Sequence, residues 1–137
     1  METKMSYDQF IPTRIMFGSG QLNNLHKQAM PGKKALIIIS NGKSTHANGY
    51  LARTEQELSL AGVETAVFDG VMPNPTVENS HAGADAARSF GADFLVALGG
   101  GSVMDCSKAI ALLATNDGDL WDYVPIGSGK GQPMQNK

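Results

Sequence analysis

Three short apolar segments stand out along the chain, and they begin about 30 residues apart. They are ALIIIS from Ala35, TAVFDG from Thr65 and DFLVALGGG from Asp93. Their hydrophobic residues follow one another with little polar alternation, which is typical of strands that are covered on both faces. The spacing fits a strand, a crossover helix and a return to the next parallel strand.

The stretches between these strands predict helices over 44–62 and 76–92, and a third helix is expected over 103–114. We expect Thr76 to cap the second helix and Gly91 to end it. The segment RIMFGSG, residues 14–20, predicts a peripheral strand, followed by a short helix through Leu22 and Leu25. The fold class that follows is α/β, with a Rossmann-like parallel sheet, flanking helices and right-handed crossovers.

Three loops follow the predicted strands, at residues 40–44, 69–76 and 99–102. In a parallel sheet they would share one edge, where ligands bind in open α/β folds. The three glycines of GGGS allow close approach of a backbone to an anion at the start of a helix. The other reading is a tight strand-to-helix turn with no ligand. Ser102 and Asp105 are expected to form a capping box there.

The length, charge and composition of the chain exclude several classes of protein. The chain has 137 residues, enough for one domain, and a formal net charge of −2. Without a Lys/Arg cluster we expect no nucleic acid partner, and the apolar runs are too short to predict a membrane span. No secretory signal is visible, and the single cysteine, Cys106, fits a reducing compartment, so a cytoplasmic protein is expected.

Several candidate motifs are weak on inspection. NGKS at 41–44 lacks the first glycine of a P-loop, and GSGQLN at 18–23 has Asn23 in place of the third glycine of a dinucleotide fingerprint. The histidines, His26, His46 and His81, have no spacing that suggests a metal site. Cys106 is expected to be a small core residue.

The segment GGGSVMDCSKAIA (99–111), PNPT (73–76) and FGSG (17–20) together resemble the iron-containing (group III) alcohol dehydrogenases. The resemblance runs from about Phe10 to the last residue. It implies that residues 1–137 are a Rossmann-like domain that binds NAD or NADP. It also implies an all-helical second domain, outside this chain, whose Asp and His ligands hold Fe²⁺ or Zn²⁺.

The resemblance also implies roles for individual residues. Gly99, Gly100, Gly101 and Ser102 match the loop that binds the cofactor pyrophosphate. Asn74 matches the PNPT asparagine that approaches the cofactor.

Asp105 and Lys108 match the acidic and basic residues of the motif, although the spacing alone also fits a surface helix pair. Ser40 falls where many NAD-using relatives carry Asp, which leaves the choice between NAD and NADP open. No metal ligand and no catalytic residue can be assigned.

The function implied for the whole enzyme is hydride transfer between NAD(P) and an alcohol or aldehyde, and we expect this chain to be inactive alone. Two alternatives stay open. In the first, the chain would be a stand-alone nucleotide-binding module, and in the second, it would be part of a lyase related to dehydroquinate synthase. A homodimer is an open alternative for its assembly.

Overall fold

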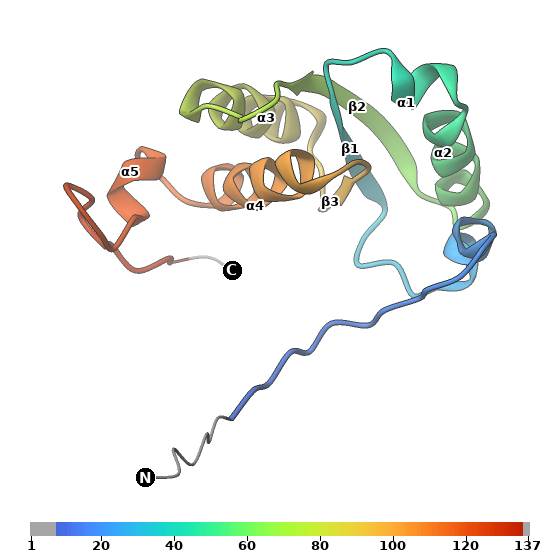
Figure 1. The fold of residues 1–137 in the computed structure, drawn as a ribbon, viewed down its shortest axis with the longest axis horizontal. Coiled ribbons are helices and arrows are strands. Elements are labelled where there is room, and N and C mark those ends of the chain that lie inside the picture. The colour runs from blue at the N-terminus through green and yellow to red at the C-terminus, as the bar shows by residue number, and fades with distance from the viewer. Residues whose placement is uncertain (1–7, 136–137) are drawn as a thin grey trace, which may run out of the picture.

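The fold is a parallel three-stranded sheet between two helical layers, as seen in a computed structural model that describes residues 8–135 (Figure 1). The strands are β1 (Lys34–Ser40), β2 (Glu64–Val71) and β3 (Phe94–Ala97), in the order β2-β1-β3. β3 lies within its predicted apolar segment, β1 extends its segment by one residue at the start, and β2 extends its segment by one residue at each end. The predicted α/β class and parallel sheet are therefore confirmed.

Strand β1 lies in the centre, and its five inner residues are buried. Alternate side chains point to opposite faces, so Leu36 and Ile38 pack in one core cluster while Ala35, Ile37 and Ile39 pack in another. This explains why the strand shows no polar alternation.

One helical layer consists of α3 (Val77–Phe90) and α4 (Gly101–Thr115), which pack against each other and against the first cluster. The other face is covered by the 3-10 helix η1 (Gln21–Lys27) and by α2 (Tyr50–Leu60). Two four-residue helices, α1 (Ser44–Ala47) and α5 (Leu120–Tyr123), complete the described elements. Among residues 8–135, none of the helices combines the length and the apolar character that a membrane span requires.

The second helix begins and ends as predicted. The Thr76 hydroxyl accepts the backbone N–H of Asn79, the Asn79 side chain accepts the N–H of Thr76, and Gly91 ends the helix with φ +71°. The predicted helix over 44–62 is wrong as a single helix, because the chain turns at Gly49 with φ +78° and starts α2 anew.

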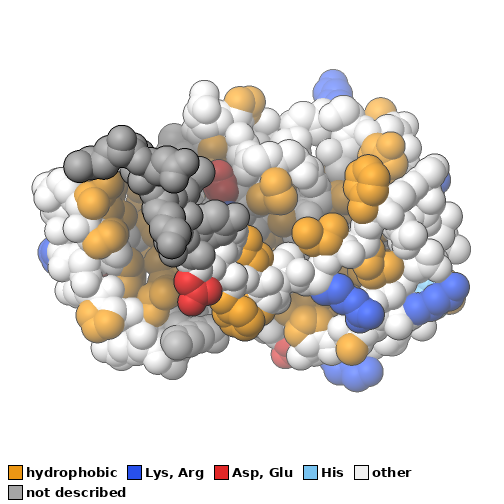
Figure 2. Space-filling view, turned by 60° about the horizontal axis from the view of Figure 1, so that its bottom comes forward, with side chains coloured by type: hydrophobic (Ala, Val, Ile, Leu, Met, Phe, Trp, Pro, Cys, Tyr) orange, Lys and Arg blue, Asp and Glu red, His pale blue; other side chains and the backbone are white. Residues whose placement is uncertain are grey.

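The predicted strand over 14–20 is also wrong. Residues 8–17 form an extended segment that leads away from the layers, and none of it pairs with the sheet within residues 8–135 (Figure 1). The side chains of Ile15 and Phe17 are 80% and 94% exposed. An apolar segment makes a strand only where a partner offers hydrogen bonds, and no described strand does so here. Hydrophobic side chains are exposed at several separate places on the face shown in Figure 2.

Candidate functional site

The strand order creates a crevice at one edge of the sheet. The chain leaves β1 through α2 on one face and passes from β2 to β3 through α3 on the other face. The connections therefore diverge next to β1, between the carboxyl ends of β1 and β3. Ligands of open α/β sheets bind at such a switch point.

A pocket of about 490 Å³ lies at this edge. The size falls within the usual range for small-molecule sites, about 300–1,000 Å³. All three predicted loops contribute to it, so the prediction that they share one edge is confirmed. The lining residues are Ser40, Ser44, Thr45, Asn48, Tyr50, Met72, Pro73, Leu98, Gly99, Gly100, Gly101, Ser102 and Val103.

The N-terminus of α4 opens into this pocket. Gly100 is the N-cap and offers no side chain to the first turn, which also contains no acidic residue. The first backbone N–H that is bonded within the helix is that of Met104, which donates to the Gly100 carbonyl at 3.1 Å. The N–H groups of the residues before it and the positive end of the helix dipole are available to an anion.

Glycine is favoured at positions 99, 100 and 101 for different physical reasons. A Cβ on Gly99 would lie 2.7 Å from Cγ2 of Val103, so packing excludes a side chain there. A Cβ on Gly100 or Gly101 would meet no protein atom within 4 Å, and neither residue has a positive φ. The fold itself therefore does not require glycine at 100 and 101. The free space on these two residues fits close approach of a phosphate.

The predicted capping box of Ser102 and Asp105 is wrong. Helix α4 starts at Gly101, two residues before the predicted start, so Ser102 lies inside the first turn and cannot cap it. Asp105 instead forms an exposed ion pair with Lys108, with 3.2 Å between Nζ and Oδ1. Both side chains lie outside the pocket lining, which favours the reading of a surface pair.

The loop after β2 is held in an unusual conformation. Asn74 has φ +53° and is the one non-glycine residue with a positive φ among those described. It does not line the pocket, although its neighbours Met72 and Pro73 do. The Asn79 side chain accepts the N–H groups of Met72 and Thr76, each at 3.4 Å, and so braces the loop. Asn79 is a positioning residue that the sequence did not suggest.

Ser40 ends β1 and lines the pocket, as its predicted place at the strand end requires. Ser44, at the end of the predicted loop 40–44, also lines the pocket, and the segment after it adds Thr45, Asn48 and Tyr50, none of which was predicted. They come to the site because the turn at Gly49 folds this segment over the end of the sheet. Because the sequence predicted one continuous helix over 44–62, it did not indicate that these residues reach the pocket.

The histidines and the cysteine lie outside this pocket. His26 and the buried Glu57 share a contact of 2.6 Å, which lowers the pKa of the Glu57 carboxyl. Burial raises the pKa of the Cys106 thiol, which packs in the core as predicted, 3.8 Å from the Ser80 hydroxyl. Within residues 8–135, no three His, Cys, Asp or Glu side chains form a group that could hold a metal ion.

Comparison with known proteins gives consistent matches. The chain is 38% identical over 113 residues to a probable NADH-dependent butanol dehydrogenase 1 of Bacillus subtilis, covering 82% of this chain and 29% of that protein. It is 37% identical over 122 residues to 1,3-propanediol dehydrogenase of Klebsiella pneumoniae, covering 88% and 32%.

Solved structures agree with these relatives. An archaeal halo-thermophilic alcohol dehydrogenase from a Red Sea brine pool matches with a TM-score of 0.85 and 34% identity, over 98% of this chain and 35% of that one. NADH-dependent butanol dehydrogenase A of Thermotoga maritima matches with a TM-score of 0.82 and 27% identity, over 95% and 32%. The chain thus spans roughly a third of the length of the proteins that it matches.

The family model for iron-containing alcohol dehydrogenase matches residues 12–137. This range includes the pocket and every helix and strand of the fold. The sequence motifs, the fold and the relatives agree, and the chain belongs to the iron-containing alcohol dehydrogenase family.

Proposed function

We propose that residues 1–137 are the NAD(P)-binding domain of a metal-dependent alcohol dehydrogenase. The observation that carries this proposal is the turn at Gly100 and Gly101, where open space and unpaired N–H groups meet at the N-terminus of α4. The turn lies at the switch point of the sheet, where dinucleotides bind in this class of fold.

Different residues of the pocket would bind different parts of the cofactor. Gly100, Gly101 and Ser102 would hold the pyrophosphate through backbone N–H groups, while Gly99 keeps the turn packed on Val103. Ser40 would lie toward a ribose at the end of β1. When bound, the nicotinamide would supply hydride transfer to or from an alcohol or aldehyde.

Asn74 would act by setting the shape of the loop after β2, since its side chain is not part of the pocket lining. Asp105 and Lys108 would affect cofactor binding only through the electrostatic potential near the start of α4, because they are exposed and paired with each other. We therefore place them outside the group of residues that contact the cofactor.

The metal of the whole enzyme is proposed to be Fe²⁺, as in the family's name, with Zn²⁺ as the alternative. No residue described here is assigned as a ligand, since none belongs to a group that could hold the ion. A helical domain would supply the ligands, and the substrate would be a small alcohol or aldehyde, as the names of the relatives suggest. Those names favour a dehydrogenase over the lyase alternative.

Calorimetric titration of the 137-residue chain with ADP and with adenosine tests the binding function. ADP should bind saturably and adenosine much more weakly, because only ADP can accept hydrogen bonds from the turn at α4. Equal affinities, or no binding of ADP, would contradict the proposed function.

A further inference from the structure

The sequence contains two Asn–Gly pairs, at 41–42 and 48–49. Asparagine is chemically labile, above all before glycine, because glycine has no side chain to hinder the approach of its nitrogen. The glycine N–H gives up its proton, its nitrogen bonds to the asparagine Cγ, and the Cγ–Nδ2 bond breaks to release ammonia. Water then opens the resulting cyclic imide to aspartate, or to isoaspartate, in which the main chain runs through Cβ. The surrounding structure decides which pair can react in this way.

The second pair, Asn48–Gly49, is held in a conformation that opposes the reaction. The Gly49 N–H donates to the His46 carbonyl at 3.2 Å. The Asn48 amide oxygen accepts the N–H of Tyr50, also at 3.2 Å. Asn48 has ψ 0°, which directs the Gly49 nitrogen toward the backbone nitrogen of Asn48 and away from its side chain. Ring closure at this pair therefore requires broken hydrogen bonds and a rotated backbone.

The first pair, Asn41–Gly42, has none of these restraints. Both residues are exposed and lie in the 41–43 loop between β1 and α1. Within residues 8–135, neither the Asn41 side chain nor the Gly42 N–H forms a hydrogen bond. The two reacting groups can thus meet without disrupting any contact of the fold.

The 41–43 loop connects two residues of the pocket lining. It begins after Ser40, the last residue of β1, and ends before Ser44, the first residue of α1. The N–H of Asn41 donates to the Val71 carbonyl at 2.9 Å and so anchors the start of the loop to β2. An isoaspartate at this anchor would add one carbon to the main chain between β1 and α1.

We propose that Asn41 is a site of spontaneous deamidation, and that this modification weakens the binding of anions in the pocket. The second part rests on the proposed binding of a cofactor phosphate at the glycine turn. None of the pocket-lining side chains is charged. Either product places a new carboxylate in the residue that follows Ser40, and this negative charge opposes the approach of a phosphate.

Peptide mass spectrometry of the 137-residue chain, incubated at neutral pH, follows the two pairs separately. Trypsin cleaves after Lys34, Lys43 and Arg53, so each Asn–Gly pair lies in its own peptide. We expect Asn41 to react about tenfold faster than Asn48, because the hydrogen bonds of Asn48 must break first. In denaturant the two rates should become similar. Methylation by an isoaspartate methyltransferase identifies the isoaspartate product.

Gly42→Ala is the matched variant for the reaction. A Cβ on Gly42 would lie 3.6 Å from the Ser40 hydroxyl oxygen, an ordinary contact, and Gly42 has no positive φ, so the fold should be retained. The methyl group hinders the attack of the nitrogen on Cγ. Deamidation at Asn41 should slow, while Asn48 should keep its rate.

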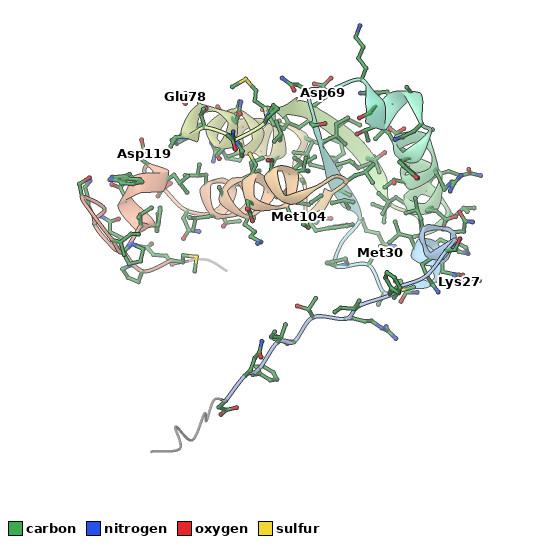
Figure 3. The ribbon with its side chains drawn as sticks, in the orientation of Figure 1. Lys27, Met30, Asp69, Glu78, Met104 and Asp119 are labelled. Atoms are coloured by element: carbon green, nitrogen blue, oxygen red, sulfur yellow. The ribbon has the colours of Figure 1, made fainter. Side chains whose placement is uncertain are left out.

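Asn41→Asp supplies the charge without the reaction. We expect ADP, titrated calorimetrically into this variant, to bind about two- to fivefold more weakly than to the wild type. Lys27→Met is the control for net charge, since it makes the chain more negative by the same amount. Lys27 lies in η1, where its Nζ donates to the Asn24 side chain at 3.0 Å, at the opposite end of the sheet from Asp69 of β2 (Figure 3). Its loss should leave the affinity for ADP unchanged.

The outcomes separate the two parts of the proposal. Equal rates at Asn41 and Asn48 in the folded chain, or a Gly42→Ala variant that reacts as fast as the wild type, would overturn the modification site. An Asn41→Asp variant that binds ADP like the wild type, or a Lys27→Met variant that loses as much affinity, would overturn the effect on binding. If the wild type does not bind ADP, the proposed function fails together with that effect, while the mass spectra still decide the modification.

Discussion

Replacing Gly101 with alanine should stabilise the fold and weaken cofactor binding at the same time. The new Cβ meets no protein atom within 4 Å, and Gly101 has a negative φ as the first residue of α4. Alanine therefore fits the folded state and lowers the entropy of the unfolded chain, which is worth about 0.4–1 kcal/mol. The melting temperature followed by circular dichroism should rise by a few degrees.

The same methyl group occupies space that the proposed pyrophosphate needs. Loss of one charge-assisted hydrogen bond costs about 1.5–3 kcal/mol, which is roughly a ten- to hundredfold increase in Kd. The assay is a titration of NADPH fluorescence against the wild type and the Gly101→Ala variant. A variant that is less stable than the wild type, or that binds NADPH as tightly, would refute the reasoning.

Gly91→Ala is the matched control for this prediction. Its Cβ also meets nothing within 4 Å, but Gly91 has φ +71° at the end of α3, far from the pocket lining. Alanine in this left-handed conformation should destabilise the fold by about 1–2 kcal/mol. The Kd for NADPH should not change, so the two glycines respond in opposite ways.

Four further outcomes are expected. Ile110→Ala, in the core between α4 and the sheet, should cost about 2–5 kcal/mol in urea unfolding, and a smaller loss would mean that the site collapses on the cavity. The lowered pKa of Glu57 beside His26 stabilises the fold above pH 4.5, the unfolded value, and this contribution is lost as the pH falls further. Glu57→Gln should therefore flatten the stability profile below pH 4.5, and an unchanged slope would contradict the pairing. Ser40→Asp should shift the ratio of the two Kd values toward NAD, and an unchanged ratio would separate Ser40 from the ribose. Asn79→Ala should weaken NADPH binding through the loop after β2, and an unchanged Kd would contradict the bracing role of Asn79.

Local chemistry was enough to predict much of this fold. Thr76 caps α3 and Gly91 ends it because a hydroxyl acceptor and a left-handed glycine act within one turn of the chain. The apolar run of β1 predicts a strand covered on both faces, and five buried residues confirm it. Features that depend on distant partners were not predictable in this way. The segment 14–20 contains the apolar run from Ile15 to Phe17, which favours a strand, but its pairing depends on a neighbour that the local pattern cannot supply.

The candidate site likewise contains features that the local sequence predicts and features that depend on distant parts of the chain. The glycine turn was predicted from its own residues, since glycines at the start of a helix are a local signal. The contribution of Thr45 and Asn48 was not predicted, because it follows from the turn at Gly49 and from the order of the strands. The exact start of α4 was also missed, and with it the role of Ser102, because helix ends vary by one or two residues with little change in sequence signal.

The central claim is that the N-terminus of α4 binds the pyrophosphate of a dinucleotide. An amide-resolved NMR titration of the isotopically labelled chain with NADP tests it most directly. We predict that the largest saturable shifts fall on the amides of Gly100, Gly101, Ser102 and Val103, which line the pocket at the start of α4. Largest shifts around the separate cavity lined by His81, Arg88 and Asp117, or no saturable shifts in the glycine turn, would contradict the account.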